Sequence, residues 1–199
     1  MADGFHHGNL KHDALEVGLK IIETDGYQKV EIKKIAAACG VSSPSIYRHF
    51  KNKDALMMAL LTRVSAIFHD YLYCDDNRTP VDDLVEMGIK FIHFSYEYKH
   101  YFEFLFNSEF VNKVISDGQS MTVVMDSKNS FSLFKKTVKR YLVEINAKGN
   151  SEMHVINLWS YISGLALISD NLEVANKEQQ LAVYVRKMIE IYTNGISNC

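Results

Sequence analysis

The chain has 199 residues and a mass of 22.8 kDa, with 47% hydrophobic residues, 23% charged residues and a formal net charge of −2. This composition excludes a disordered chain, and the charge excludes a protein that binds polyanions over its whole surface. Three cysteines without a Cys-x-x-Cys pair argue against a disulfide scaffold or a cysteine-built zinc site. We expect no membrane span and no signal peptide, and therefore a cytoplasmic protein.

The first two predicted helices come before residue 40. Residues 10–25 repeat apolar side chains at helical spacing, and Gly26 can end that helix with a positive φ. Residues 30–38 form a second, short helical pattern that Gly40 breaks.

Two more helices are predicted up to residue 71. Ser42 is a suitable N-cap for a third helix that ends near Phe50, and Pro44 fits its first turn. Asn52 can cap a fourth helix, whose apolar positions continue to Tyr71.

Beyond a polar loop at 74–80, the apolar spacing predicts five further helices. Their expected ranges are 80–98, 100–115, 120–147, 151–170 and 177–194. The sequence therefore predicts an all-α protein, with a small head at about 10–50 and a helical body joined to it through the fourth helix.

Charge is concentrated in the predicted head. Between Gln28 and Lys53 there are six basic residues and one acid, Glu31, which gives a local charge of +5. A small basic module on an acidic body is typical of a DNA-binding head. Taken alone, the lysines fit a solvent-exposed helix face as well as they fit a DNA-binding surface.

The segment from Ile32 to Phe50 has the pattern of a helix-turn-helix. Ala36 is small enough for a close helix crossing, Gly40 suits the turn, and Ile46 and Phe50 can bury one side of the second helix. Polar side chains are left to face a DNA groove: Ser42, Ser43, Ser45, Tyr47 and His49.

Residues 10–60 resemble the N-terminal DNA-binding domain of the TetR/AcrR family of transcriptional regulators. The residues that carry the resemblance are Gly26-Tyr27, Ile35-Ala36, Cys39-Gly40-Val41-Ser42, Ile46-Tyr47-Arg48-His49-Phe50 and Lys51-Asn52-Lys53-Asp54-Ala55-Leu56. The resemblance implies a DNA-binding domain at 1–55 and an effector-binding and dimerisation domain at 56–199.

The resemblance also implies roles for single residues. Tyr47 and Lys53 would contact phosphates, whereas the short polar side chains of the second helix would read base edges. The full set of expected DNA-binding residues is Lys33, Ser42, Ser43, Ser45, Tyr47, Arg48, His49 and Lys53. Family members often have Thr or Ser at the start of the preceding helix, where this chain has Val30-Glu31.

A finer resemblance concerns the subfamily whose C-terminal domain is named for a Trp, a His and a Gly. The opening segment 6–11 is similar to the lead-in of that subfamily. Trp159 and Gly164 match, but Ser163 stands where the His would fall.

Nine aromatic residues occur between Phe91 and Phe110. By resemblance, the body would bind a small-molecule effector in a pocket lined by Phe91, Phe94, Tyr98, Tyr101, Phe102, Phe106 and Trp159. Ordinary core packing would also explain several of these rings. No metal site and no cofactor is expected, because ligand spacing for either is absent from the sequence.

Residues 155–168 are apolar almost all the way round, so we expect this helix to be covered on more than one face. By resemblance, the last two helices would pair with their copies in a homodimer. The expected interface residues are Ser160, Ser163, Gly164, Leu167, Leu181, Val185 and Met188. A helix buried inside a monomer would give the same pattern.

The sequence therefore predicts a ligand-responsive repressor that binds a palindromic double-stranded DNA operator as a homodimer. The alternative is a helical protein-binding module without sequence-specific DNA binding. We expect no enzymatic activity, because no phosphate loop, nucleophile elbow or supported cysteine nucleophile is present. Helix four is expected to transmit effector binding to the head.

Overall fold

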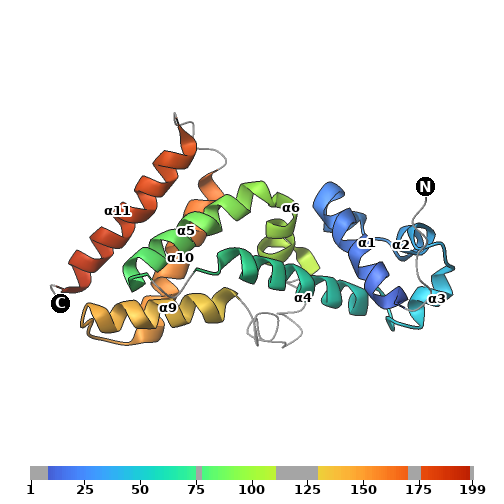
Figure 1. Ribbon diagram of the computed structural model, residues 1–199, viewed down its shortest axis with the longest axis horizontal. Coiled ribbons are helices and arrows are strands. Elements are labelled where there is room, and N and C mark those ends of the chain that lie inside the picture. Colours follow the sequence, from blue (N-terminus) through green and yellow to red (C-terminus); the bar gives the residue numbers. More distant parts are fainter. Residues whose placement is uncertain (1–8, 75–77, 111–129, 170–175, 198–199) are drawn as a thin grey trace. The chain divides into compact units, whose positions relative to one another are not determined.

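The computed structural model describes residues 9–74, 78–110, 130–169 and 176–197. Every regular element in these ranges is a helix, which confirms the all-α prediction (Figure 1).

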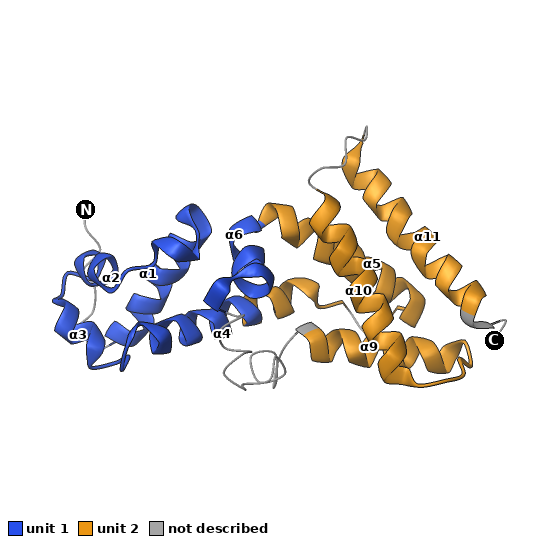
Figure 2. Cartoon of the chain, turned by 180° about the vertical axis from the view of Figure 1, so that it is seen from behind, with its two compact units in different colours: residues 1–65, 98–124 blue, residues 66–97, 125–199 orange. Residues whose placement is uncertain are grey.

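The chain divides into two compact units, which Figure 2 colours separately. The first contains the described residues of 1–65 and 98–124, and the second those of 66–97 and 125–199. The structural boundary therefore falls inside a helix, later than the expected division at residue 55, and a segment that starts at Tyr98 belongs to the first unit. The functional division into two domains stays a prediction.

The helices of the first unit follow the predicted order, with bounds that differ by a few residues. They are α1 (Leu10–Asp25), the 3-10 turn η1 (Tyr27–Lys29), α2 (Ile32–Ala38), α3 (Ser43–Tyr47) and the first part of α4 (Lys53–Leu72). Gly26 has the expected positive φ, 88°, and its N–H donates to Ile22 O at the end of α1. Asn52 caps α4 as predicted, because its Oδ1 accepts the Ala55 N–H at 2.8 Å.

Apolar side chains from four helices form the core of this unit. Ile22, Ile35, Ile46 and Leu60 are each 0% exposed. Gly18 lets α1 approach α4, since a Cβ at this position would stand 2.8 Å from Leu60 Cδ2. Burial of these side chains stabilises the short helices, which would not be stable in isolation.

A later segment also packs within the first unit. The expected helix at 100–115 is instead α6 (Lys99–Phe102) followed by the π-helix η2 (Glu103–Asn107), which ends where Ser108 becomes extended. The prediction of helical structure holds for the described residues except Ser108, which is extended and buried with its Oγ donating to Phe104 O, and residues 109–110 are helical again. Residues 111–115 lie outside the described ranges.

This segment contacts α1 and η1 through aromatic side chains. The ring of Phe104 stacks on Tyr27 at a centroid distance of 5.3 Å. Tyr101 OH donates to Leu19 O at 3.3 Å, and Tyr27 OH accepts the Glu109 N–H at 3.3 Å. The start of the head is therefore joined to residues that follow the predicted body helix in the chain.

The second unit is a bundle in which α5 (Pro80–Glu97) packs against three partners. They are α9 (Ser130–Glu144), α10 (Ser151–Ser169) and α11 (Lys177–Ser197). Of the helix expected at 120–147, residues 120–129 lie outside the described ranges. The described part ends at Glu144, and Asn146 has a positive φ of 50°.

One helix of the described residues, α4, is long and apolar enough to cross a membrane by length and composition alone. This differs from the expectation that no such stretch exists. The apolar side chains of α4 serve another purpose, since Leu56, Leu61, Val64 and Phe68 are buried in the protein core. A core helix passes the same length and hydropathy test.

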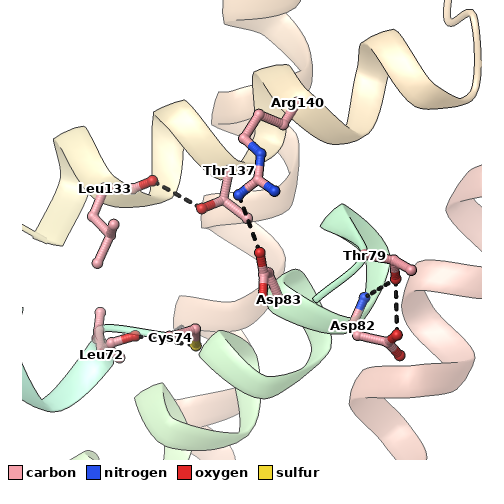
Figure 3. Close-up of polar contacts among 8 residues, drawn as sticks. All are labelled: Leu72, Cys74, Thr79, Asp82, Asp83, Leu133, Thr137 and Arg140. Atoms are coloured by element: carbon pink, nitrogen blue, oxygen red, sulfur yellow. Dashed lines mark hydrogen bonds and ion pairs between the residues drawn. The ribbon is translucent and has the colours of Figure 1, made fainter. Parts of the chain in front are cut away.

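An ion pair joins α5 to α9 inside the second unit (Figure 3). Arg140 Nη1 donates to Asp83 Oδ2 at 3.2 Å, and the Asp83 side chain is only 4% exposed. The second oxygen, Asp83 Oδ1, is buried without a hydrogen-bond partner among the described residues. A carboxylate in this position depends on the guanidinium for its charge to be tolerated.

Replacing Arg140 by Met should therefore lower the free energy of unfolding by about 3 kcal/mol, because the Asp83 charge stays buried without its partner. The double variant Asp83→Leu with Arg140→Met should recover most of this loss. Chemical denaturation measures both. The matched control is Arg63→Met, which removes an exposed pair with Glu16 and should cost less than about 1 kcal/mol. If Arg140→Met and Arg63→Met lowered the free energy of unfolding equally, burial of Asp83 would not be the reason for the loss.

Candidate nucleic-acid interface

The turn between α2 and α3 has the geometry of a helix-turn-helix. Gly40 has a φ of 67°, and the Val41 N–H donates to Ala36 O at 2.9 Å. Ala36 is 2% exposed where α2 packs against α3. Burial raises the pKa of the Cys39 thiol above its usual range, which agrees with an apolar filler before the turn.

The third helix presents a polar face to solvent because its apolar side chains point inward. Ile46 and Phe50 are buried, whereas Tyr47 is 50% exposed. Pro44 lies in the first turn as predicted. Ser42 was expected to cap the helix, but it makes no capping bond; its hydroxyl instead shares a hydrogen bond with the Ser45 hydroxyl at 3.1 Å.

All eight residues predicted to bind DNA lie in the first unit, on or beside α2, α3 and the start of α4. Six are exposed, and Ser43 and Ser45 are half-buried. The exposed residues are Lys33, Ser42, Tyr47, Arg48, His49 and Lys53. Because Asn52 caps α4, Lys53 stands at the first position of that helix, where backbone N–H groups also favour anions.

One lysine of the basic segment is neutralised within the protein. Lys34 Nζ lies 3.0 Å from Glu31 Oε1, and this hydrogen bond and charge hold the pKa of the Glu31 carboxyl below its usual range. Lys53 and Lys29 lower the same pKa more weakly through their charge. Glu31 therefore occupies the start of α2 as an internal partner of Lys34, at the point where the family often has a hydroxyl.

The seven residues expected to line one pocket are not brought together. Phe91 and Trp159 line a small apolar cavity of about 20 Å³ in the second unit, and Phe94 of the same unit is buried against Phe68. The other four belong to the first unit: Tyr98, Tyr101, Phe102 and Phe106. Aromatic content alone could not separate these groups, because the chain changes unit between residues 97 and 98.

The cavity itself is small, and no charged residue lines it. Its lining includes Leu72, Met87 and Met188 besides Phe91 and Trp159. Trp159 is held edge-on by three phenylalanine rings, those of Phe91, Phe131 and Phe134, each with a centroid 5.2–5.3 Å away. A volume of about 20 Å³ admits roughly one water molecule.

The expected dimer residues divide between two sides of the last two helices. Leu181, Val185 and Met188 are buried inside the second unit, where Val185 packs against Gly88 of α5, so they do not form an outer surface. Ser160, Gly164 and Leu167 are exposed, and Ser163 is half-buried. The prediction for α11 was wrong because its apolar stripe is the inward one.

The helix expected to be covered on several faces is covered on one. Val155, Leu158, Ile162 and Ala166 of α10 are buried, whereas the opposite side is exposed to solvent. Sequence reasoning missed most of the exposed apolar residues of α10 and α11. They are Met153, Ile156, Tyr161, Leu167, Ile168, Val183, Tyr184 and Ile191.

No group of three or more His, Cys, Asp or Glu side chains within the described ranges is placed to hold a metal ion.

Comparison with known proteins gives matches of two kinds. A family model for "Bacterial regulatory proteins, tetR family" matches residues 14–60. The tetracycline repressor protein class D of Escherichia coli is 31% identical over 61 residues, which are 31% of this chain. The matched region spans only 28% of that repressor's own length.

Solved structures are similar over almost the whole chain. A TetR-like transcriptional regulator from Rhodococcus sp. RHA1 has a TM-score of 0.63 at 16% identity, covering 94% of this chain and 96% of that one. A TetR variant from Acinetobacter baumannii AYE, in complex with minocycline, has a TM-score of 0.59 at 19% identity, covering 92% and 96%. At these identities the likeness establishes the fold.

The expected subfamily with a Trp-His-Gly domain is not tested by these matches and stays a prediction. Two findings bear on the family: the sequence match at residues 14–60 and the fold of the chain. Residues 14–60 match the tetR family of bacterial regulatory proteins, and the chain has the fold of TetR-like transcriptional regulators.

Proposed function

We propose that the protein is a transcriptional repressor that binds a palindromic DNA operator as a homodimer and releases it on binding a small-molecule effector. One observation carries the proposal: a rigid helix-turn-helix presents α3 and the first residue of α4 with exposed polar and basic side chains. A repressor acts where the chromosome is, so the proposed function implies a cytoplasmic protein.

DNA binding is supported by the chemistry of the exposed face. Lys33 and Lys53 make no ion pair within the described residues, so their charges are available to phosphates. Tyr47 is exposed at the end of α3, the helix that such motifs place in the major groove, and His49 is exposed just after it. A similar protein, the class D tetracycline repressor, bears the name of a repressor, which favours repression over activation.

Homodimer formation is supported by the uncovered side of α10 and α11. Tyr161, Leu167, Ile168 and Ile191 are each more than half exposed, and a groove with a volume of about 470 Å³ lies between the two helices. Several exposed apolar side chains on one pair of helices are typical of an interface with another protein. A second copy of the chain can cover this apolar side with its own α10 and α11. Such a pair has the twofold symmetry that a palindromic operator requires.

Effector binding is supported by the cavity in the second unit. Its apolar lining favours an uncharged, apolar molecule, because a charged group would lose its hydration without a partner. The cavity must widen to admit such a molecule, so binding would move the helices that line it. A structurally similar protein is in complex with minocycline, which supports small-molecule binding by this chain.

Two parts of the chain can carry that movement to the head. Helix α4 was expected to be the single link, and Leu72 at its end lines the cavity. We infer a second link: residues 98–110 follow α5, which contributes Phe91 to the cavity, and they pack on α1 and η1 through Tyr101 and Phe104. A ligand releases DNA only through its different affinity for the two arrangements.

The DNA contacts divide into those that position the protein and those that read sequence. Lys53→Ala should weaken binding to all sequences about equally and reduce the slope of log affinity against log salt by about one. His49→Ala should instead change which sequences are selected from random DNA. Fluorescence anisotropy at several salt concentrations measures the first effect, and Lys187→Ala, an exposed lysine of α11, is the control of equal charge. A changed base preference in Lys53→Ala alone would reverse the two roles.

Dimerisation should depend on the uncovered face. Leu167→Glu combined with Ile168→Glu should yield a folded monomer, because four charges would be desolvated across the twofold axis. Sedimentation velocity gives the mass, and affinity for a full operator should fall toward that for a half-site. Val143→Glu is the control, since Val143 is 77% exposed on α9. A stable dimer of the double variant would show that the interface lies elsewhere.

Effector and operator should weaken each other's binding by the same factor. Tyr101→Phe removes the bond to Leu19 O and should reduce that factor several-fold, with little loss of stability. Effector affinity, measured calorimetrically with and without saturating operator, gives the factor for a compound first selected by operator release. Tyr141→Phe, which removes a buried hydroxyl contact to Thr193 within the second unit, is the control. Equal effector affinities with and without operator would contradict the proposed response.

A further inference from the structure

A chain of hydrogen bonds joins three residues on the exposed side of α3. Arg48 Nη2 donates to Ser45 Oγ at 3.0 Å, and Ser45 Oγ lies 3.1 Å from Ser42 Oγ, with either hydroxyl as donor. The three residues are spaced three apart, so they follow one side of the helix. Ser42 and Arg48 are exposed, and Ser45 between them is half-buried.

The position of Arg48 on the helix directs its side chain away from the protein. Its backbone is still helical, with φ −68° and ψ −24°. At 100° per residue, Arg48 lies about 160° around the helix from Ile46, whose side chain is completely buried. The guanidinium therefore belongs to the outermost ridge of α3, and the bond to Ser45 holds it along that ridge.

The charge of Arg48 is not neutralised within the part of the chain that the structure describes. Three other arginines, Arg63, Arg78 and Arg140, each lie within 4.0 Å of a carboxylate oxygen. Arg48 has only the Ser45 hydroxyl as a partner there. An arginine has five N–H donors in a planar fork, so a single bond to a hydroxyl leaves most of them available for a ligand.

The hydrogen bond from the Arg48 guanidinium to the neutral Ser45 hydroxyl affects how Arg48 can bind a ligand. It restricts the rotamers of a long side chain without reducing its charge, so less freedom is lost when a ligand binds. A planar fork held in this way suits a ligand with two adjacent acceptors in one plane. In a DNA major groove that pattern belongs to guanine, through O6 and N7.

We propose that Arg48 reads one guanine in each operator half-site, and that Ser45 is a positioning residue that orients the Arg48 guanidinium. This inference rests on the proposed function, since it names the base that the interface recognises. Ser45 then contributes to specificity through Arg48 and not through a base contact of its own. Ser42 supports Ser45 from the start of the helix.

The test begins with selection of bound fragments from random DNA by the full-length protein. The wild type should select a guanine at one fixed position of each half-site. Arg48→Lys keeps the charge but loses the fork, so its preference for that guanine over the other bases should fall about 5- to 150-fold. Its salt dependence should stay within experimental error of the wild type.

The positioning role is tested by two substitutions of Ser45. Ser45→Ala should reduce the preference for the same guanine several-fold, while Arg48 is still present. Ser45→Thr retains a hydroxyl and should restore most of the preference. Arg63→Lys, an exposed arginine of α4, is the matched control and should leave the selected sequence unchanged.

Each outcome decides between the proposals. A wild type that binds no DNA fragment overturns the proposed function and this inference together. Specific binding in which Arg48→Lys keeps the guanine preference, or in which Arg48→Ala only lowers the salt dependence, shows that Arg48 holds a phosphate and overturns the inference alone. An unchanged preference in Ser45→Ala overturns the positioning role.

Discussion

The recognition surface depends on the burial of Ile46 and Phe50. Helix α3 has five residues, Ser43–Tyr47, which is far too short to be stable by its own hydrogen bonds. Ile46 in α3 and Phe50 just after it are buried, and this fixes the position of the helix and its rotation about its own axis. The side chains on the opposite side of α3 therefore point to solvent. The hydrogen bonds of Ser42, Ser45 and Arg48 can orient these side chains only because the rotation of α3 is fixed. The specificity that we propose for this surface therefore depends first on apolar packing.

The sequence predicted best what short-range chemistry decides. Gly26 and Gly40 have the positive φ that their turns require, and Asn52 caps α4 through its own side chain. The helix-turn-helix was predictable for the same reason: its small residue, its glycine and its apolar pair act within twenty residues. Ser42 is the informative exception in this region. Its hydroxyl had a choice of partners, and the competing one, Ser45, lies only one turn away.

Predictions that required knowledge of distant partners were less successful. The apolar positions of α11 were correctly recognised, but periodicity does not tell which surface an apolar stripe meets, and Val185 meets Gly88 of α5. For α10 the sequence showed apolar residues all round, yet only a tertiary structure separates the side covered by this chain from the side left open. The aromatic run from Phe91 to Phe110 was assigned to one pocket because nothing local marks the change of compact unit at residue 98.

That change of unit gives the aromatic run a different physical role from the expected one. Phe91 lines a cavity with room for about one water molecule, so the effector binding that we propose would have to displace packed helices. A close-packed interior does not deform gradually, and the displacement passes to whatever is continuous with those helices. Residues 98–110 are continuous with α5 and hold α1 through Tyr101 and η1 through Phe104. Under the proposed function, an effector that widens this cavity favours the arrangement of the chain in which the wider cavity exists, and this difference in affinity between the two arrangements is what releases DNA.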